Sequence, residues 1–420
     1  MAFRLSLLRR SRFAAGALAR GLLAAVLVAG IGWGGSLYAA NQSVQGAKKA
    51  EDAGFDGDAP TAILIEASSG SVLFEKNADE LRAPSSMMKL MTAEVVFDAI
   101  KKGDIKLTDE YRISENAWRR GGAPSGTSTM FAAINSKVSV DDLLHGAIIP
   151  SGNDACIALA EGIAGNEHTF ATDFMTKRAR ELGMTKSTFG NSNGLPDPTN
   201  KMTVRELAVL ARHIIQAYPD QYKLFGEKEF TWNKIRQQNR NPLLNALPGA
   251  DGLKTGYTKE GGYGMVGSAV QNDTRLIVVV NGLEDSEDRA TEAKKMLEWG
   301  FRSFETRTLI AANQPVGYAR VFGGESRSVK LVSPDPVKVM VSKNGNDKLL
   351  ARVIYSGPVK APIAAGQKIG VVRVWRGANV AMEAPVFAAD AVGTGSTMRR
   401  ALDGAQELVI GMFRAGVEKL

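Results

Sequence analysis

A helix that is apolar on nearly every side starts directly behind a serine and a lysine three positions apart. Residues 90–100 form the apolar run, and Ser86-Met-Met-Lys89 precedes it, two positions after Pro84. A helix with no polar face has to be buried inside a folded protein. The chain must therefore fold around this helix. Positions three apart lie on one helical face, so the lysine amine can reach the serine hydroxyl.

The Ser86–Lys89 pair predicts nucleophilic catalysis. A serine hydroxyl is a weak nucleophile until a neighbouring base takes its proton. A lysine amine can act as that base only when it is neutral, which requires burial or nearby positive charge to lower its pKa of about 10.4. Pro84 places Ser86 in the first turn of the helix, where unpaired backbone N–H groups can hold an oxyanion.

A second motif, Ser151-Gly-Asn153, interrupts apolar helical segments within residues 138–164. A hydroxyl at such a break can pass a proton to a leaving amine, and the asparagine can bind a peptide carbonyl of the substrate. Two other Ser-x-Asn triplets occur, at 114–116 and 342–344. We reject the first because no apolar helix follows it, and the second because it lies beyond the third motif.

The third motif is Lys254-Thr255-Gly256, which Tyr257 follows. The stretch is typical of an edge strand, where an extended peptide can pair with the backbone. Lysine and threonine suit a terminal carboxylate, and Gly256 allows a close approach of the substrate. Any one of the motifs arises by chance in a chain of this composition. The three in this order match the signature of penicillin-binding proteins and β-lactamases.

Longer stretches resemble one family, the low-molecular-weight penicillin-binding proteins that act as serine D-alanyl-D-alanine carboxypeptidases. The resemblance covers roughly residues 58–310, continues more weakly afterwards, and is carried by segments 149–160, 230–237, 239–244, 251–256 and 297–301. It implies an enzyme that removes the terminal D-alanine of peptidoglycan stem pentapeptides through an acyl-serine intermediate. It also implies acylation by penicillin and other β-lactams, a part in cell-wall remodelling and cell shape, and no cofactor or metal.

The resemblance also assigns roles to individual residues. The catalytic ones are Ser86 as nucleophile, Lys89 as its base, and Ser151 and Asn153, which assist proton transfer and hold the substrate. The substrate-binding ones are Lys254 for electrostatics, Thr255 for the carboxylate, Gly256, Tyr257, Arg289 and Arg240. The backbone N–H groups of Tyr257 and Ser86 would form the oxyanion hole.

The two arginines are placed by different arguments. Arg289 falls where these enzymes keep an arginine facing the substrate carboxylate; the alternative is a surface charge at a helix start, within the acidic stretch 284–288. Arg240 is a second candidate for this role, although the interval between it and Lys254 is one residue shorter than in the family.

Several other functions find little support. The formal net charge is +8, but residues 1–40 hold five arginines and no acid, so about +3 remains for the rest. No basic run dense enough to follow a phosphate backbone is left, which argues against nucleic-acid binding.

The three histidines lie far apart, which disfavours a zinc hydrolase. Cys156 lies in an apolar run and is expected to pack there. Gly190-Asn-Ser-Asn-Gly194 fits a nucleophile elbow, but Leu195-Pro-Asp-Pro follows it, so we interpret it as a turn.

Two rival functions remain. A class A-like β-lactamase would need a glutamate that drives deacylation, and its usual segment is Glu-x-x-Leu-Asn. The nearest match, residues 229–233, has tryptophan in place of leucine and lies in a β-like run, so we judge it coincidental. The second rival is a non-catalytic wall-binding scaffold on the same fold, and the intact motifs argue against it.

We predict an α/β (α+β) transpeptidase/β-lactamase-like catalytic domain at residues 59–312. It should combine a sheet covered by helices with an all-helical part, and the site should lie in the cleft between them. A small all-β sandwich is expected at 313–395, where short β-like runs alternate with Gly, Asn and Pro turns. Residues 396–420 repeat apolar side chains every three or four positions, which predicts an amphipathic helix.

The two ends of the chain predict export and membrane attachment. Residues 1–40 combine an arginine-rich start, an apolar stretch and a small-residue exit, as in a secretory signal peptide, and 41–58 would be a linker. The alternative is an uncleaved N-terminal anchor. The helix at 396–420 would hold a periplasmic enzyme on the outer face of the cytoplasmic membrane; the alternative is a helix packed on the β module.

Overall fold

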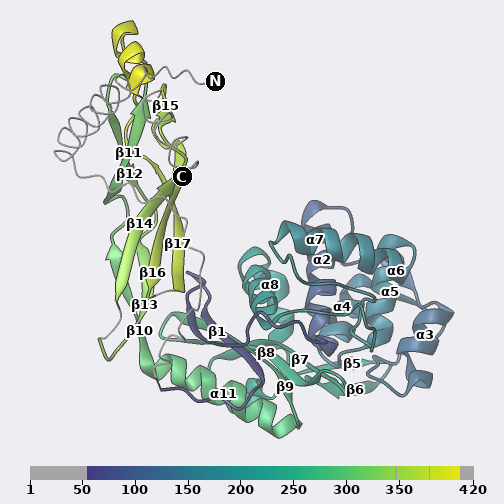
Figure 1. Cartoon of the computed structure of the whole chain (residues 1–420). Coiled ribbons are helices and arrows are strands. Elements are labelled where there is room, and N and C mark those ends of the chain that lie inside the picture. Colours follow the sequence, from purple (N-terminus) through teal and green to yellow (C-terminus); the bar gives the residue numbers. More distant parts are fainter. Residues whose placement is uncertain (1–53, 346–347, 378, 407–420) are drawn as a thin grey trace, which may run out of the picture. The chain divides into compact units, whose positions relative to one another are not determined.

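The computed structural model describes residues 54–345, 348–377 and 379–406 (Figure 1). The predicted signal peptide, most of the linker and the second half of the terminal helix lie outside these ranges. Among the helices of the described residues, none is both long and apolar enough to cross a bilayer. The predicted fold class is confirmed: a mixed α/β catalytic domain comes first and an all-β domain follows it.

A five-stranded antiparallel sheet forms the base of the catalytic domain, in the order β2-β1-β9-β8-β7. Its strands are β1 (Thr61–Glu66), β2 (Val72–Lys76), β7 (Ala250–Thr258), β8 (Gly262–Gln271) and β9 (Thr274–Leu283). The middle strand β9 contains a continuous buried run, residues 276–281. Such a run is typical of a strand covered on both faces. Strand β7 lies at the end of the sheet, so the prediction of an edge strand at Lys254–Gly256 is confirmed.

The helices of this domain form two groups around the sheet (Figure 1). They are η1 (Ser85–Met88), α2 (Lys89–Lys102), α3 (Glu115–Gly121), η2 (Ala123–Ser125), α4 (Val140–Ile148), α5 (Asn153–Ala164), α6 (Glu167–Thr169), η3 (Phe170–Met175), α7 (Thr176–Glu181), α8 (Val204–Ala217), α9 (Pro219–Tyr222), η4 (Lys223–Gly226), α10 (Leu243–Ala246) and α11 (Ser286–Ser303). Two small two-stranded sheets accompany them: β3 (Glu110–Arg112) pairs with β4 (Lys137–Ser139), and the hairpin strands β5 (Glu229–Trp232) and β6 (Ile235–Gln238) pair with each other.

Helix α2 is the centre of the larger hydrophobic core, as its sequence predicts. Every residue from Lys89 to Phe97 is buried, and the surrounding core draws on α4, α5, α8 and one face of the sheet. Helix α11 packs on β8 and β9 in a second core on the other face. The predicted break between apolar helical segments is also confirmed, because α4 ends at Ile148 and α5 begins at Asn153.

The all-β domain has one hydrophobic core that two sheets share. Its strands are β10 (Phe304–Ile310), β11 (Pro315–Phe322), β12 (Ser328–Val332), β13 (Val337–Ser342), β14 (Leu349–Tyr355), β15 (Val359–Lys360), β16 (Lys368–Arg376) and β17 (Asn379–Ala388). Strand β10 pairs with β13, and the other six form one sheet in the order β14-β16-β17-β12-β11-β15. Strand β10 precedes residue 313, where our sequence boundary stood.

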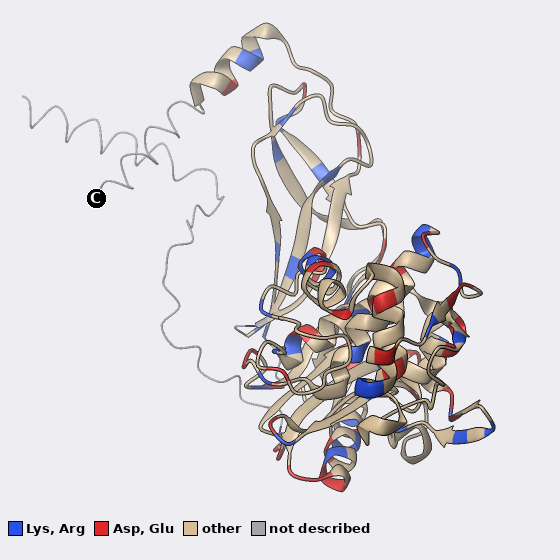
Figure 2. Cartoon of the chain, turned by 90° about the vertical axis from the view of Figure 1, so that its right-hand side faces the viewer, with Lys and Arg blue, Asp and Glu red and all other residues tan. Residues whose placement is uncertain are grey.

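Charged residues of both signs are interspersed over the helices and loops of the catalytic domain (Figure 2). The described part of the terminal helix, residues 397–406, presents two sides of different character. The Asp403 carboxylate accepts a hydrogen bond from the N–H of Gly323 at 2.8 Å, and the Arg399 guanidinium donates to the Glu325 carbonyl. Met398 and Leu402 are 76% and 63% exposed.

Candidate active site

Ser86 and Lys89 lie where the 3₁₀ turn η1 runs into α2. The Nζ of Lys89 lies 2.8 Å from the Oγ of Ser86, as the three-residue spacing predicts. Ser86 is half-buried, whereas Lys89 is only 2% exposed. The preceding residue, Ser85, has a φ of +52°. A non-glycine residue in this region carries strain of about 1–3 kcal/mol and persists only where its surroundings hold it.

The amine of Lys89 also contacts two acceptors that hold it from other sides. One is the Oδ1 of Asn153 at 2.7 Å, and the other is the backbone carbonyl of Asn193 at 2.6 Å. The side chain of Asn153 is itself oriented, because its Nδ2 donates to the Oγ1 of Thr127 at 2.9 Å. The first two sequence motifs therefore meet at a single lysine amine.

The electrostatics of the site favour a neutral lysine. The pKa of Lys89 is lowered from 10.5 to about 8, chiefly by burial; the charge of Arg240 contributes to this lowering, whereas Cys156, Asp154 and Glu167 act in the opposite direction. Burial also lowers the pKa of Lys254, and the positive charge of Lys89 adds to that effect. Two ammonium groups this close, in a buried place, repel one another, so the pair favours the loss of a proton.

Ser151 lies in the turn between α4 and α5. It has a φ of +68°, is buried, and its Oγ has no hydrogen-bond partner in the described part of the chain. A buried hydroxyl without a partner costs free energy, so its presence calls for an explanation. Asn153, two positions later, starts α5 and donates its backbone N–H to the Ser128 carbonyl at 2.8 Å.

The third motif lies on β7 beside η1. Lys254 and Thr255 are buried. A Cβ atom added to Gly256 would lie 3.0 Å from the Pro84 carbonyl oxygen and 3.1 Å from the Met87 nitrogen. The close approach that Gly256 permits is therefore that of the serine-bearing turn to the strand, rather than only that of a substrate.

A cavity of about 470 Å³ opens over these residues. Its lining brings together four residues that the sequence singled out, namely Ser86, Asn153, Arg240 and Tyr257. Tyr257 is 54% exposed, and its ring stacks on that of Tyr263 with 4.1 Å between ring centroids. The remaining lining residues are Gly126, Thr127, Ser128, Gly194, Leu195, Pro196, Thr258 and Lys259. This lining contains no aspartate or glutamate in the part of the chain that is described.

Arg289 and Arg240 approach the site from different elements. The guanidinium of Arg289, in the first turn of α11, lies over the ring of Tyr263, 5.5 Å from its centroid. Its Nε is buried and has no hydrogen-bond partner among the described residues. Burial lowers the pKa of Arg289, and its charge also acts on Lys254. Arg289 is therefore not the fully exposed surface charge of the alternative interpretation.

Two loops of the site belong to none of the three motifs. Residues 190–194 form the turn that we predicted, but the Asn193 carbonyl of this turn holds Lys89. Residues 126–128 line the cavity. The residues that follow are tied to α5 by the buried Asp154, whose carboxylate accepts from the Thr129 hydroxyl at 2.7 Å and the Met130 N–H at 2.9 Å. Backbone contributions of this kind leave no residue-type signature in a sequence.

Glu229 and Cys156, on which alternative functions would depend, do not line the cavity. Glu229 pairs with Arg236 across the β5–β6 hairpin and does not line the cavity. Cys156 is fully buried, and burial raises the pKa of its thiol to about 11, which is unsuited to a nucleophile. The described residues include no cluster of three or more His, Cys, Asp or Glu side chains able to hold a metal ion.

Comparison with known proteins identifies the family. The D-alanyl-D-alanine carboxypeptidase family matches residues 46–285, and the C-terminal domain of penicillin-binding protein 5 matches residues 304–394. The chain belongs to the D-alanyl-D-alanine carboxypeptidase family. It is 40% identical to D-alanyl-D-alanine carboxypeptidase DacA of Haemophilus influenzae, over 75% of this chain and 80% of the relative.

Solved structures of penicillin-binding proteins are also similar to this chain. Penicillin-binding protein 5 from Haemophilus influenzae matches with a TM-score of 0.71 and 38% identity, over 80% of this chain and 98% of that one. Penicillin-binding protein D2 from Listeria monocytogenes, in its ampicillin-bound form, matches with a TM-score of 0.53 and 27% identity, over 59% of this chain and 98% of that one.

Proposed function

We propose that this family member is a serine D-alanyl-D-alanine carboxypeptidase that removes the terminal D-alanine from peptidoglycan stem pentapeptides. The observation that carries the proposal is the contact of the Lys89 Nζ with the Ser86 Oγ at 2.8 Å, together with the lowered pKa of that lysine. A neutral amine at this distance can accept the hydroxyl proton as the oxygen attacks.

In the first step, the Ser86 oxygen attacks the carbonyl carbon of the penultimate D-alanine, and Lys89 takes the serine proton. The oxyanion of the tetrahedral intermediate is held by the N–H groups of Ser86 and Tyr257, at the start of a helix and on an edge strand. The C–N bond then breaks, and a proton passes through the Ser151 hydroxyl to the departing amine of D-alanine. Water hydrolyses the acyl-serine and restores the hydroxyl.

The terminal carboxylate of the substrate requires positive charge, and the site provides it. Lys254 and the hydroxyl of Thr255 lie on the edge strand, where an extended peptide can add its backbone. The positive charges of Arg289 and Arg240 both act on Lys254. The unpartnered hydroxyl of Ser151 would gain a hydrogen-bond partner when a substrate enters, which offsets its cost in the free enzyme.

Penicillin and other β-lactams should acylate Ser86 and leave slowly. Rapid release requires a base that activates water, and no carboxylate lines the cavity among the described residues. This favours a carboxypeptidase over a β-lactamase.

We further propose export to the periplasm, on the basis of residues 1–40, and attachment to the outer face of the inner membrane through residues 396–420. The exposed apolar side chains of Met398 and Leu402 support the attachment.

Labelling with a fluorescent penicillin tests the proposal. The wild-type protein should carry one label, on the peptide that contains Ser86, and mass spectrometry should show a purified pentapeptide losing one D-alanine. Ser86→Ala should remain folded by circular dichroism and lose both reactions. Labelling that persists in this variant would refute the assignment of the nucleophile, and rapid steady-state turnover of penicillin would favour the β-lactamase.

A further inference from the structure

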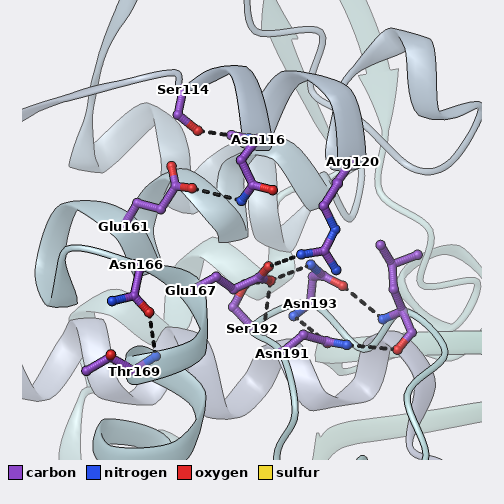
Figure 3. A network of polar contacts seen from close by, with 12 residues as sticks. Ser114, Asn116, Arg120, Glu161, Asn166, Glu167, Thr169, Asn191, Ser192 and Asn193 are labelled. Carbon is purple, nitrogen blue, oxygen red and sulfur yellow. Dashed lines mark hydrogen bonds and ion pairs between the residues drawn. The ribbon is translucent and has the colours of Figure 1, made fainter.

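A buried carboxylate outside the cavity holds the loop that contacts the catalytic lysine (Figure 3). Glu167, the first residue of α6, is 6% exposed. Its Oε1 accepts hydrogen bonds from the Ser192 N–H at 3.1 Å, the Ser192 Oγ at 2.7 Å and the Asn193 Nδ2 at 2.9 Å. Its Oε2 pairs with the Arg120 guanidinium at 3.0 Å. One oxygen of this side chain therefore organises two successive residues of the loop.

The opposite side of the same loop rests on α2. The Ser192 carbonyl accepts from the Thr92 hydroxyl at 2.5 Å, and the next carbonyl, that of Asn193, accepts from the Lys89 Nζ at 2.6 Å. The loop thus lies between Glu167 on one side and two side chains of α2 on the other. A shift of the loop away from Glu167 would carry the Asn193 carbonyl away from the lysine.

The protons of the amine explain why this carbonyl matters. A neutral lysine has two N–H protons and one lone pair, and only the lone pair can accept the proton of Ser86. The Asn153 Oδ1 and the Asn193 carbonyl are acceptors, so each takes one proton when the amine is neutral. The lone pair then has one direction left, toward the Ser86 Oγ. Losing the Asn193 contact would free the amine to rotate and aim a proton at Ser86 instead.

We propose that Glu167 is a positioning residue for Lys89, acting through the three hydrogen bonds that hold Ser192 and Asn193. The proposal rests on the proposed function of Ser86 and Lys89 and assigns Glu167 no contact with substrate. A misplacement of about 1 Å at a reacting group can cost on the order of 10²-fold in rate. Loss of the carboxylate oxygen should therefore slow acylation far more than it weakens penicillin binding.

The charge of Glu167 adds a second, separable effect. The charged and titratable groups that act on Lys89 are Asp154, Glu167 and Cys156, which raise its pKa, and Arg240, which lowers it; Lys254 lies beside them. Removing the negative charge of Glu167 while keeping an acceptor oxygen should shift the acylation midpoint to lower pH.

Two variants separate these effects. Glu167→Gln keeps an amide oxygen for the three hydrogen bonds, whereas Glu167→Ala removes the acceptor. Stopped-flow acylation by fluorescent penicillin, at saturation and between pH 6 and 10, gives a plateau rate and a midpoint for each. We expect Glu167→Ala to lose about tenfold to hundredfold of the plateau rate. Glu167→Gln should stay within about threefold of wild type, because it retains the hydrogen bonds, and its midpoint should lie at lower pH.

Glu161→Ala is the matched control. This nearby carboxylate, in α5, binds Asn116 at 2.9 Å and does not touch the loop (Figure 3), so the variant should match wild type. A folded Glu167→Ala that acylates at the wild-type plateau rate would overturn the proposal, as would equal losses in the Gln and Ala variants. If Glu167→Ala does not fold, Ser192→Ala and Asn193→Ala replace it, since each removes one bond to Oε1; wild-type plateau rates in both would overturn the proposal.

An error in the proposed function of Ser86 would show in the wild-type protein, before any Glu167 variant is compared. If wild-type protein is not labelled on Ser86 at any pH, the proposed function is wrong, independently of the Glu167 variants. If wild type is labelled, the comparison of the variants tests the positioning role alone.

Discussion

The pH dependence of acylation follows from the surroundings of Lys89. Burial lowers its pKa to about 8, and only the neutral amine can accept the proton of Ser86. At pH 7, a group with a pKa of 8 is neutral in roughly one molecule in ten, and at pH 6 in roughly one in a hundred. At the ordinary value of 10.5, the neutral fraction at pH 7 would be about 300-fold smaller than with the lowered pKa. The lowered pKa therefore raises the fraction of protein with a neutral Lys89 at pH 7 by about two and a half powers of ten.

The acylation rate should accordingly fall about tenfold per unit below pH 7 and level off above pH 9. Replacing Arg240 by glutamine removes a positive charge that lowers the pKa of Lys89. The pKa should then rise, so the midpoint should move to higher pH and the rate at pH 7 should fall, while the plateau at saturating penicillin changes little. The measurement is the stopped-flow rate of labelling over pH 6–10, in a buffer series of constant ionic strength.

A matched control comes from the neighbouring hairpin. Arg236 is an exposed arginine paired with Glu229, and it is not among the main charges acting on Lys89, so Arg236→Gln should leave the midpoint in place. A labelling rate that is independent of pH from 6 to 9, while Ser86→Ala abolishes labelling, would refute Lys89 as the titrating base. A midpoint that moves to lower pH in Arg240→Gln would refute the electrostatic reasoning.

Three further predictions concern the strand, the carboxylate site and the terminal helix. In Gly256→Ala, the new Cβ would lie 3.0 Å from the Pro84 carbonyl, and overpacking of this kind costs about 1–3 kcal/mol. Thermal unfolding should therefore occur at lower temperature, and labelling should slow by at least about tenfold. A wild-type melting curve and labelling rate would contradict this. Arg289→Ala should reduce hydrolysis of a D-alanyl-D-alanine peptide about tenfold to hundredfold, and hydrolysis of an ester that lacks the carboxylate much less; equal effects would argue for a structural role. A protein ending at residue 395 should leave the membrane fraction of cells, and retention as firm as that of the full chain would exclude the helix as anchor.

Much of the fold was predictable because its strongest signals are local. The all-round apolar run of α2 requires burial whatever surrounds it. The Pro150-Ser-Gly-Asn153 interruption breaks an otherwise helical stretch, as Pro and Gly do. The boundary of the β domain was harder to place, because β10 (residues 304–310) has exposed residues at most positions and depends on pairing with β13, more than 25 residues further along the chain.

The site was predictable to the extent that it is made of motif side chains. The sequence placed Ser86, Lys89 and Asn153 in one constellation, and the structure brings them into a single set of hydrogen bonds. It gave no sign of the Asn193 carbonyl, since any residue type supplies a carbonyl. Gly256 was predicted to leave space for a substrate, whereas the structure shows that it also lets η1 approach the strand.

The missed parts share a physical reason. Catalysis by a buried lysine needs an amine whose proton acceptors are fixed, and fixed acceptors inside a protein must themselves be hydrogen-bonded. The orientation of Lys89 therefore depends on residues outside the three motifs: Thr127 fixes Asn153, and Glu167 fixes the loop of Asn193. Each of these contacts joins residues 26 positions apart in the sequence, which is too far for helical or strand periodicity to indicate the pairing. A motif search finds the side chains that react, and the packing of three separate segments onto α2 determines which way the reacting amine points.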